Sequence, residues 1–285
     1  AADILRMTAK DLKVKAPLYV HRNYNLPYWA DKDCLAIFVS YSGNTEETLS
    51  AFQEGQRKKL PSVVITSGGK LALLANRKKI ALVKIPPGLP PRMSMGLQFS
   101  ALVTILSNCK LLDFNLNVVS SLEKRLQPKR LERKGKLLAR KLKNRIPVIY
   151  ASYRNKELAR IWKIKFNENS KVPAFANYFP ELNHNEMVGF ERISSFQPSI
   201  FKPYILILKD PADHPRIQKR MKLTADILRG KKVAVDFIEI NGKDNLSKVF
   251  SSLLLSDWAS YYLALNYKVD PSPVKTVEDF KQRMK

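Results

Sequence analysis

LAIFVSYSGNTEETL, residues 35–49, begins with five consecutive apolar residues, Leu35 to Val39. An uninterrupted apolar run of this length predicts a strand that is buried on both faces, as in a parallel sheet covered by helices. Small polar residues then dominate from Ser40 to Thr45. From Glu46 onward the pattern becomes helical, with two carboxylates in the first turn, where they favour the helix dipole. The stretch therefore predicts a strand, a tight turn and a helix N-terminus in succession.

The predicted turn is a candidate anion site. Backbone N–H groups and the hydroxyls of Ser40, Ser42 and Thr45 would converge there, near the positive end of a helix dipole. The alternative is an ordinary strand-to-helix turn with a Ser or Thr cap. The residues alone do not decide between the two.

The composition predicts a folded chain without a membrane span. Its 285 residues, 45% of them hydrophobic, are enough for two domains of ordinary size or one large one. No window approaches 18 uncharged apolar residues, and no signal peptide is recognisable. Cys34 and Cys109 form no disulfide or metal-binding pattern. We therefore expect a cytoplasmic protein.

The charge of the chain is strongly positive. Its 50 Lys and Arg against 25 Asp and Glu give a formal net charge of +25, which makes nucleic acid a partner to consider. However, the basic residues are spread along the chain. The densest run, residues 122–145, has leucines at roughly helical spacing. We interpret this run as exposed connecting helices and do not expect nucleic acid as a partner.

Strand and helix patterns alternate along the chain, which predicts an α/β protein with mostly parallel sheets flanked by helices. Two similar halves suggest a domain boundary near residue 145, and hence domains 1–145 and 146–285. The predicted strands are Pro17–Val20, Leu35–Val39, Ser62–Thr66, Ala81–Ile85, Val148–Ala151, Tyr204–Leu208 and Val233–Ile240. The predicted helices are residues 2–12, Thr45–Lys58, Leu71–Ala75, Met95–Leu106, Asn155–Lys165, His214–Leu228, Asn245–Leu265 and Val277–Met284.

Two further segments are rich in amide and carboxylate side chains. They are FNENSK, residues 166–171, and PELNHNE, residues 180–186. Such segments hold polar ligands and orient carboxylates by hydrogen bonds. A single Glu is usually a solvated surface charge, however, and His184 taken alone is compatible with a structural loop histidine. Composition alone does not decide whether these side chains have a functional role.

Several motifs together resemble one family. SYSGNTEET (residues 40–48) resembles the phosphosugar-binding signature of the sugar isomerase (SIS) domain. FNENSK and PELNHNEMVGFE (180–191) resemble catalytic segments of the bifunctional phosphoglucose/phosphomannose isomerases, and LPPRMSMG (89–96) their arginine loop. DPADHPRIQKRMKLT (210–224) and VEDFKQRMK (277–285) resemble later segments of the same family. The combination is far more specific than any one motif.

This resemblance implies a fold and a reaction. The fold would be two SIS-type, doubly wound domains. The activity would be metal-independent aldose–ketose isomerisation, which interconverts glucose 6-phosphate, and also mannose 6-phosphate, with fructose 6-phosphate through a cis-enediol. No cofactor is implied. His21, His184 and His214 are dispersed and show no ligand spacing, so no metal is expected.

The resemblance also assigns roles to residues. Ser40, Ser42 and Thr45 would hold the phosphate, and Arg92 would stabilise the enediolate. Glu168 would be the general base. His184 would assist ring opening, contributed across the interface of a homodimer, and Lys281 would contact the ring oxygen or the phosphate.

The sequence leaves three points open. His214 rivals His184 for the ring-opening role, although a structural role at a helix start fits it as well. Thr276 is the candidate hydroxyl for accepting mannose 6-phosphate, with Ser272 as the alternative. The family's glycine-rich turn lies before the segment that resembles AADIL, where this sequence begins. The sequence as given is therefore expected either to be a fragment or to lack part of the substrate site.

Two other functions compete with the isomerase. A non-catalytic SIS-type sugar-phosphate sensor would need only the Ser40–Thr45 turn, but no helix-turn-helix segment is recognisable. A nucleic-acid-binding protein would rest on the charge alone. The sequence does not decide between glucose and mannose preference.

Overall fold

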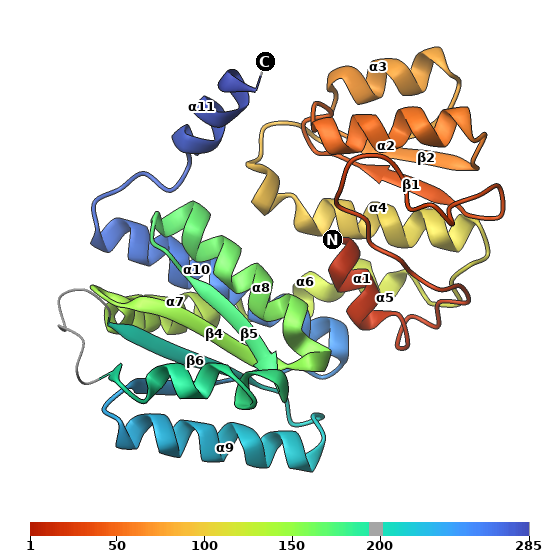
Figure 1. Cartoon of the computed structure of the whole chain (residues 1–285). Coiled ribbons are helices and arrows are strands. Elements are labelled where there is room, and N and C mark those ends of the chain that lie inside the picture. Colours follow the sequence, from red (N-terminus) through yellow and green to blue (C-terminus); the bar gives the residue numbers. More distant parts are fainter. Residues whose placement is uncertain (194–201, 285) are drawn as a thin grey trace. The chain divides into compact units, whose positions relative to one another are not determined.

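The computed structural model describes residues 1–193 and 202–284. It comprises two compact units, Ala1–Val119 and Ser120–Lys285 (Figure 1). Each unit contains one sheet in which every strand pairing is parallel, with helices packed against the sheet. The predicted α/β class with helix-flanked parallel sheets is thereby confirmed.

The division between the units lies between Val119 and Ser120, not near residue 145. The basic run forms two helices, α6 (Leu122–Arg125) and α7 (Pro128–Leu142), and α7 packs against α10 (Asn245–Asn266) of the second unit. The two helices approach closely at Gly135, where an added Cβ would lie 2.5 Å from the Cβ of Trp258. Residues 120–145 therefore belong to the second unit.

Unit 1 is built on a three-stranded sheet of order β1-β2-β3. Its elements are α1 (Ala2–Thr8), β1 (Ala36–Val39), α2 (Glu46–Arg57), β2 (Ser62–Thr66), α3 (Gly69–Arg77), β3 (Ala81–Lys84), the 3₁₀ helix η1 (Pro91–Met93), α4 (Met95–Asn108) and α5 (Asn117–Ser120). Val39 is in register with Ile65, and Ile65 with Val83. The carboxyl ends of the three strands therefore lie along one edge of the sheet.

The core of unit 1 explains its strand and helix pattern. Phe38 of β1 and Phe52 of α2 are buried and meet edge to face, with ring centroids 5.3 Å apart. Val64 of β2 and Leu71 of α3 are fully buried in the same cluster. Within this unit, α2 and α3 cover one face of the sheet and α4 lies on the other (Figure 1).

Unit 2 has a four-stranded sheet of order β5-β4-β6-β7. Its elements are α6 (Leu122–Arg125), α7, β4 (Ile146–Ser152), η2 (Tyr153–Asn155), α8 (Lys156–Lys165), the π-helical turn η3 (Phe166–Ser170), β5 (Phe175–Phe179), η4 (Glu181–Asn183), η5 (Glu186–Phe190), β6 (Pro203–Lys209), α9 (Pro215–Gly230), β7 (Ala234–Glu239), α10 and α11 (Lys275–Arg283). The strand order reverses between β4 and β6, which makes their carboxyl ends the switch point of a doubly wound sheet.

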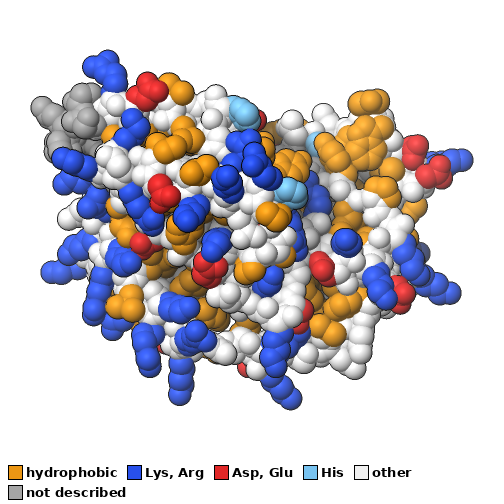
Figure 2. All heavy atoms as spheres, turned by 90° about the horizontal axis from the view of Figure 1, so that it is seen from below, with side chains coloured by type: hydrophobic (Ala, Val, Ile, Leu, Met, Phe, Trp, Pro, Cys, Tyr) orange, Lys and Arg blue, Asp and Glu red, His pale blue; other side chains and the backbone are white. Residues whose placement is uncertain are grey.

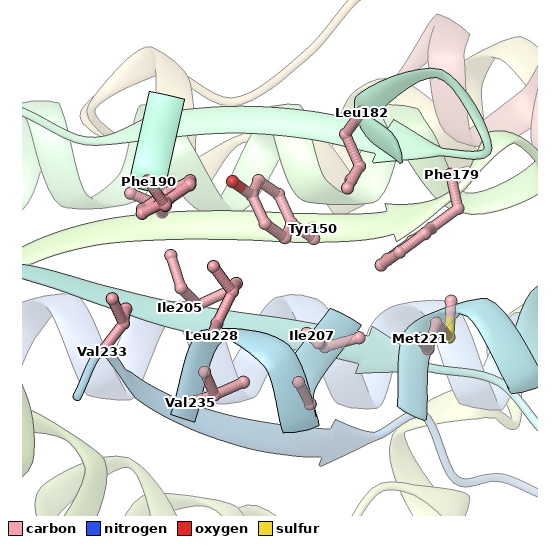
Figure 3. Close-up of a cluster of buried hydrophobic side chains, with 12 residues drawn as sticks. Tyr150, Phe179, Leu182, Phe190, Ile205, Ile207, Met221, Leu228, Val233 and Val235 are labelled. Carbon is pink, nitrogen blue, oxygen red and sulfur yellow. The ribbon is translucent and has the colours of Figure 1, made fainter. Parts of the chain in front are cut away.

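The main core of unit 2 lies between its sheet and α9 (Figure 3). Ile205 and Ile207 point from β6 toward Met221 and Leu228 of α9, and all four are at most 1% exposed. Burying each such side chain stabilises the fold by about 1.5–3 kcal/mol. The strand residues of this cluster alternate in sequence, as expected for one face of a sheet.

Some predicted elements are wrong or missing. Residues 17–20 form no strand: Pro17 lacks an N–H, and Tyr19 is 64% exposed and packs edge-on against Trp29. The helix predicted over residues 2–12 ends at Thr8, whose hydroxyl donates to the carbonyl of Ile4. The structure adds β5, which was not predicted because Asn177 interrupts its short apolar run and Pro173 and Pro180 flank it. The other predicted elements are present, with their ends shifted by a few residues.

Basic side chains are numerous on the face of the molecule that Figure 2 draws. Figure 2 shows one face of the molecule, on which Lys and Arg side chains are spread among apolar and uncharged groups rather than gathered in one patch. Among the described residues, none of the helices has the length and apolar character needed to cross a membrane.

Candidate active site

The turn after β1 is held by its own hydroxyls. Ser40 is 5% exposed, and its Oγ lies 2.8 Å from Oγ1 of Thr45. The same Oγ accepts the N–H of Gly43 at 3.1 Å. Since one hydroxyl of the Ser40–Thr45 pair donates to the other, one O–H of the pair remains for a ligand. Ser42 and Thr45 are exposed, whereas Ser40 is buried.

The turn after β2, residues 67–69, is hydrogen-bonded to the turn after β1. The N–H of Ser67 donates to the carbonyl of Tyr41, and the N–H of Leu71 donates to the carbonyl of Gly43, both at 2.9 Å. Gly43 has φ +68°, and a Cβ there would lie 1.8 Å from the carbonyl oxygen of Gly68. Only glycine fits such a close approach of two backbones with a left-handed φ. The small residues of the second turn therefore support the first.

The N-terminus of α2 opens onto the same turn. Thr45 is its N-cap residue, yet its side chain makes no capping hydrogen bond because the hydroxyl is turned toward Ser40. The first-turn N–H groups therefore have no side-chain cap, which suits an anion. The carboxylate of Glu46 is bonded to Tyr24 at 3.0 Å, and this bond raises the pKa of the Tyr24 hydroxyl.

Arg92 lies in unit 1, on a proline loop that follows β3. The side chain is 8% exposed and belongs to η1. The Tyr41 hydroxyl donates to the carbonyl of Pro86 at 3.0 Å and accepts the N–H of Leu89 at 2.8 Å. The loop is therefore tied to the residue between Ser40 and Ser42. Sequence reasoning missed Tyr41, although its place inside the SYSGNT motif was a usable signal.

Glu168 lies in unit 2, on a π-helical turn anchored to α10. The neighbouring Asn169 donates to Oγ of Ser260 at 2.9 Å, and the Ser170 hydroxyl donates to the carbonyl of Ser260 at 2.8 Å. Lys165, one turn earlier, is 2% exposed and pairs with Asp257 at 2.6 Å. Single-turn π-helices are frequent at functional sites, and this one holds the backbone of Glu168 in a fixed place.

The two histidine candidates differ in their surroundings. His184 follows η4 and is exposed. His214 is the N-cap of α9, and its Nδ1 accepts the N–H of Arg216 at 3.1 Å. The structural role considered for His214 is therefore the one observed. Close to His184 in sequence, the Glu186 carboxylate accepts hydrogen bonds from Tyr150 and Asn177, and burial beside this carboxylate raises the pKa of Tyr150.

The remaining candidates belong to the C-terminal segment. Thr276 and Lys281 lie on α11 and are exposed. Ser272 lies in the linker before this helix, where its N–H donates to Asp270 at 2.8 Å. The structure thus brings Ser40, Ser42 and Thr45 together and places Arg92 in the same unit. Glu168, His184, Thr276 and Lys281 are all carried by unit 2.

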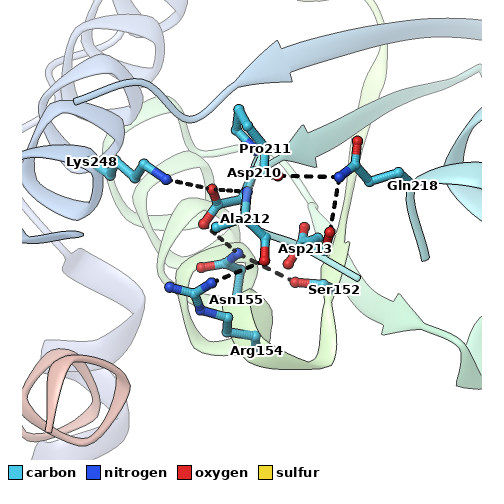
Figure 4. Close-up of polar contacts among 9 residues, drawn as sticks. All are labelled: Ser152, Arg154, Asn155, Asp210, Pro211, Ala212, Asp213, Gln218 and Lys248. Carbon is cyan, nitrogen blue, oxygen red and sulfur yellow. Dashed lines mark hydrogen bonds and ion pairs between the residues drawn. The ribbon is translucent and has the colours of Figure 1, made fainter. Parts of the chain in front are cut away.

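The strand ends of the second sheet hold a closed polar cluster (Figure 4). Asp210 is 1% exposed and pairs with Lys248 at 2.8 Å. Burial would raise the pKa of Asp210, but hydrogen bonds from Lys248 and from the Ala212 N–H outweigh it and lower the pKa. Burial raises the pKa of Asp213, against the opposing bond from Ser152, and the charge of Asp210 adds to the rise.

The fold and a match to a family model define the class of protein. Residues 131–284 match the family model described as the bacterial phospho-glucose isomerase C-terminal SIS domain. Solved structures of similar fold include the C-terminal domain of glucosamine-fructose-6-phosphate aminotransferase from Francisella tularensis (TM-score 0.68, 13% identity, 95% of this chain and 81% of that one). Glucosamine-6-phosphate deaminase from Thermotoga maritima has a TM-score of 0.64 at 14% identity, over 87% and 74% of the two chains. The chain is an SIS-domain protein.

Relatives in sequence define the family. The bifunctional phosphoglucose/phosphomannose isomerase of Caldicellulosiruptor bescii is 38% identical over 99% of this chain and 85% of its own length. Its counterpart in Aquifex aeolicus is 35% identical over 94% of this chain and 82% of its own length. The chain belongs to the bifunctional phosphoglucose/phosphomannose isomerase family.

Proposed function

We propose that this protein interconverts glucose 6-phosphate and mannose 6-phosphate with fructose 6-phosphate, without a metal. The observation that carries the proposal is the match along nearly the whole chain to relatives named for this pair of activities. The uncapped helix start beside Ser40, Ser42 and Thr45 supports it, because a sugar phosphate needs an anion site. A non-catalytic sensor is not favoured by these relatives.

In this proposal the substrate phosphate binds at the turn after β1. Its oxygens accept hydrogen bonds from the hydroxyls of Ser42 and Thr45 and from the N–H groups in the first turn of α2. Ser40 holds the turn from below by bonding to Gly43 and Thr45. Because the phosphate is remote from the reacting carbons, its binding energy positions the sugar.

The isomerisation itself needs a base and a fixed cation. Glu168 moves a proton between C1 and C2, a contribution of about 10²–10⁴-fold for a positioned general base. Arg92 stabilises the negative charge of the enediolate, and Tyr41 preorganises its loop through Pro86 and Leu89. The cation and the phosphate site thereby share one rigid support.

The other side chains act on the rest of the sugar. His184 exchanges the ring-opening proton near neutral pH and is contributed by the second copy in a homodimer. Lys281 contacts the ring oxygen or the phosphate. Thr276 is the hydroxyl that accepts the mannose epimer, with Ser272 as the alternative.

The test is a coupled assay with EDTA present, using each of the three sugar phosphates with the unaltered chain and with Glu168→Gln. The unaltered chain should turn over glucose 6-phosphate and mannose 6-phosphate. Glu168→Gln should lower kcat by about 10²–10⁴-fold with little change in KM, because the amide cannot accept the proton. The matched control is Glu157→Gln, at the start of α8, which pairs with Arg160 at 2.8 Å and should keep full activity. Full turnover by Glu168→Gln would refute the assigned base.

A second candidate reaction is epimerisation. D-glucosamine-6-phosphate 4-epimerase of Sulfolobus acidocaldarius is 29% identical over 96% of this chain and 82% of its own length. Glucosamine 6-phosphate should therefore be included as a substrate. Its conversion, with no turnover of the three hexose phosphates that lack an amino group, would replace the isomerase proposal.

A further inference from the structure

The turn that carries Glu168 ends in a lysine with an unusual set of partners. Nζ of Lys171 lies within hydrogen-bonding distance of three backbone carbonyl oxygens: Glu168 at 2.5 Å, Pro271 at 3.2 Å and Pro273 at 2.5 Å. An ammonium group has three N–H donors, so these bonds match its full donor capacity. Hydrogen bonds from a charged donor are about twice as strong as neutral ones. Lys171 therefore joins the turn of Glu168 to the linker before α11.

These bonds do not simply follow from the backbone of Lys171. Its φ is +58°, but six other lysines of the described residues also have left-handed backbones. They are Lys13, Lys59, Lys79, Lys110, Lys232 and Lys268. Within the part of the chain that the structure describes, Lys171 alone of these seven bonds to backbone carbonyls through its side chain. The contact is specific to this turn.

The linker before α11, residues 270–274, has a restricted backbone where it contacts Lys171. Pro271 and Pro273 restrict its backbone and present their carbonyls to Lys171. The carboxylate of Asp270 accepts the N–H of Ser272. This bond lowers the pKa of Asp270, and the charges of Lys171 and Lys275 add to the effect. In contrast, α11 itself has no buried residue. The position of α11 therefore depends on where the linker is fixed.

We propose that Lys171 is a positioning residue that couples the turn of Glu168 to α11 and thereby places Lys281. This inference rests on the proposed function, in which Glu168 and Lys281 act on one sugar phosphate. Replacing Lys171 by an uncharged residue removes the ammonium group that bonds the carbonyls of Glu168, Pro271 and Pro273. The base then keeps its anchors on Ser260, while α11 loses its fixed starting point.

A double-mutant cycle tests this coupling. Lys171→Met, which keeps the length of the side chain, should lower kcat for fructose 6-phosphate about 10–100-fold and raise KM by a smaller factor, because the phosphate contacts of unit 1 are kept. Lys281→Met should also lower kcat. In the Lys281→Met background, Lys171→Met should cost less than about threefold, because the residue it places is gone. Lys268→Met is the control and should match the unaltered chain. Losses that multiply in the double variant would overturn the proposal.

A second measurement does not depend on activity. Hydrogen–deuterium exchange of the α11 amides should be at least about fivefold faster in Lys171→Met, and unchanged in Lys268→Met. Asp270→Asn, which keeps an acceptor for Ser272, should change exchange in the same direction by a smaller factor. Equal exchange in Lys171→Met and the unaltered chain would refute the coupling. If the unaltered chain isomerises none of the sugar phosphates, the proposed function fails, and exchange alone decides the role of Lys171.

Discussion

At the scale of single residues, the phosphate turn depends on glycine at position 43. Its φ of +68° and the 1.8 Å that would separate an added Cβ from the Gly68 carbonyl oxygen leave room for hydrogen alone. This contact is between two backbones, so no side-chain rotation relieves it. The two turns at the strand ends must separate before any larger residue fits.

Gly43→Ala should therefore lower the free energy of unfolding by about 2–4 kcal/mol, through both the left-handed φ and the clash. The phosphate turn should be distorted, and KM for fructose 6-phosphate should rise. Gly88→Ala separates the two causes: Gly88 has φ +95° but no atom within 4 Å of an added Cβ, so it should cost only about 1–2 kcal/mol. Urea unfolding of both variants measures the difference. Equal losses would show that the backbone contact is unimportant.

At the scale of helices, one ending recurs through the chain. In α3, the N–H of Ile80 donates to the carbonyl of Ala75 and the N–H of Lys79 to that of Asn76, with Lys79 at φ +56°. This is a Schellman motif, in which glycine usually occupies the left-handed position. The helices α2, α4, α9 and α10 end in the same way, with Lys59, Lys110, Lys232 and Lys268 at that position. The chain therefore has a lysine where glycine is conformationally easier.

Lys79→Gly should stabilise unit 1 by about 0.5–1 kcal/mol, because the exposed side chain makes no contact that is lost and glycine removes the left-handed strain. Lys78→Gly, one residue earlier at φ −90°, should instead be destabilising by about 0.5 kcal/mol or more. The midpoints of urea unfolding check both values. A gain in neither variant would mean that lysine is tolerated at φ +56° without cost.

The strands differ in how far their sequence predicts them. β1 was predicted to be buried on both faces, but it is an edge strand of its sheet, and only Phe38 of its four residues is buried. β2 and β6 are nearly continuous apolar runs, and their burial was predictable from that pattern. β5 was not, because FANYF contains Asn177, whose amide bonds to Glu186 in the folded chain. The residues of the phosphate turn were likewise predictable from one contiguous motif. Tyr41 was missed although it lies inside that motif, because its contacts with Pro86 and Leu89 are more than 40 residues away in sequence. Lys171 was not predictable, because two of the three carbonyls that it binds, those of Pro271 and Pro273, are about 100 residues away and no local spacing encodes such contacts.

At the scale of the whole molecule, two parallel sheets each offer strand ends at which an anion could bind, but they differ in what occupies them. In unit 1 the strand end carries hydroxyls and an uncapped helix start. In unit 2 the switch point is filled by Asp210, whose partner Lys248 already neutralises it, and by the buried Asp213. An anion entering there would meet two carboxylates and would have to displace an ion pair, which is costly in a buried site.

We therefore predict one sugar-phosphate site per chain. Calorimetric titration with fructose 6-phosphate should give a stoichiometry of one. Ser42→Ala should weaken binding about 10–100-fold, because a hydroxyl that contacts a charged group contributes about 1.5–3 kcal/mol. The matched control is Ser152→Ala, at the end of β4, where the hydroxyl accepts a bond from Asn155 at 3.3 Å. This variant should bind as the unaltered chain does, because its hydroxyl belongs to the closed cluster. A stoichiometry of two, or a loss of affinity in Ser152→Ala equal to that in Ser42→Ala, would mean that the second sheet also binds the phosphate.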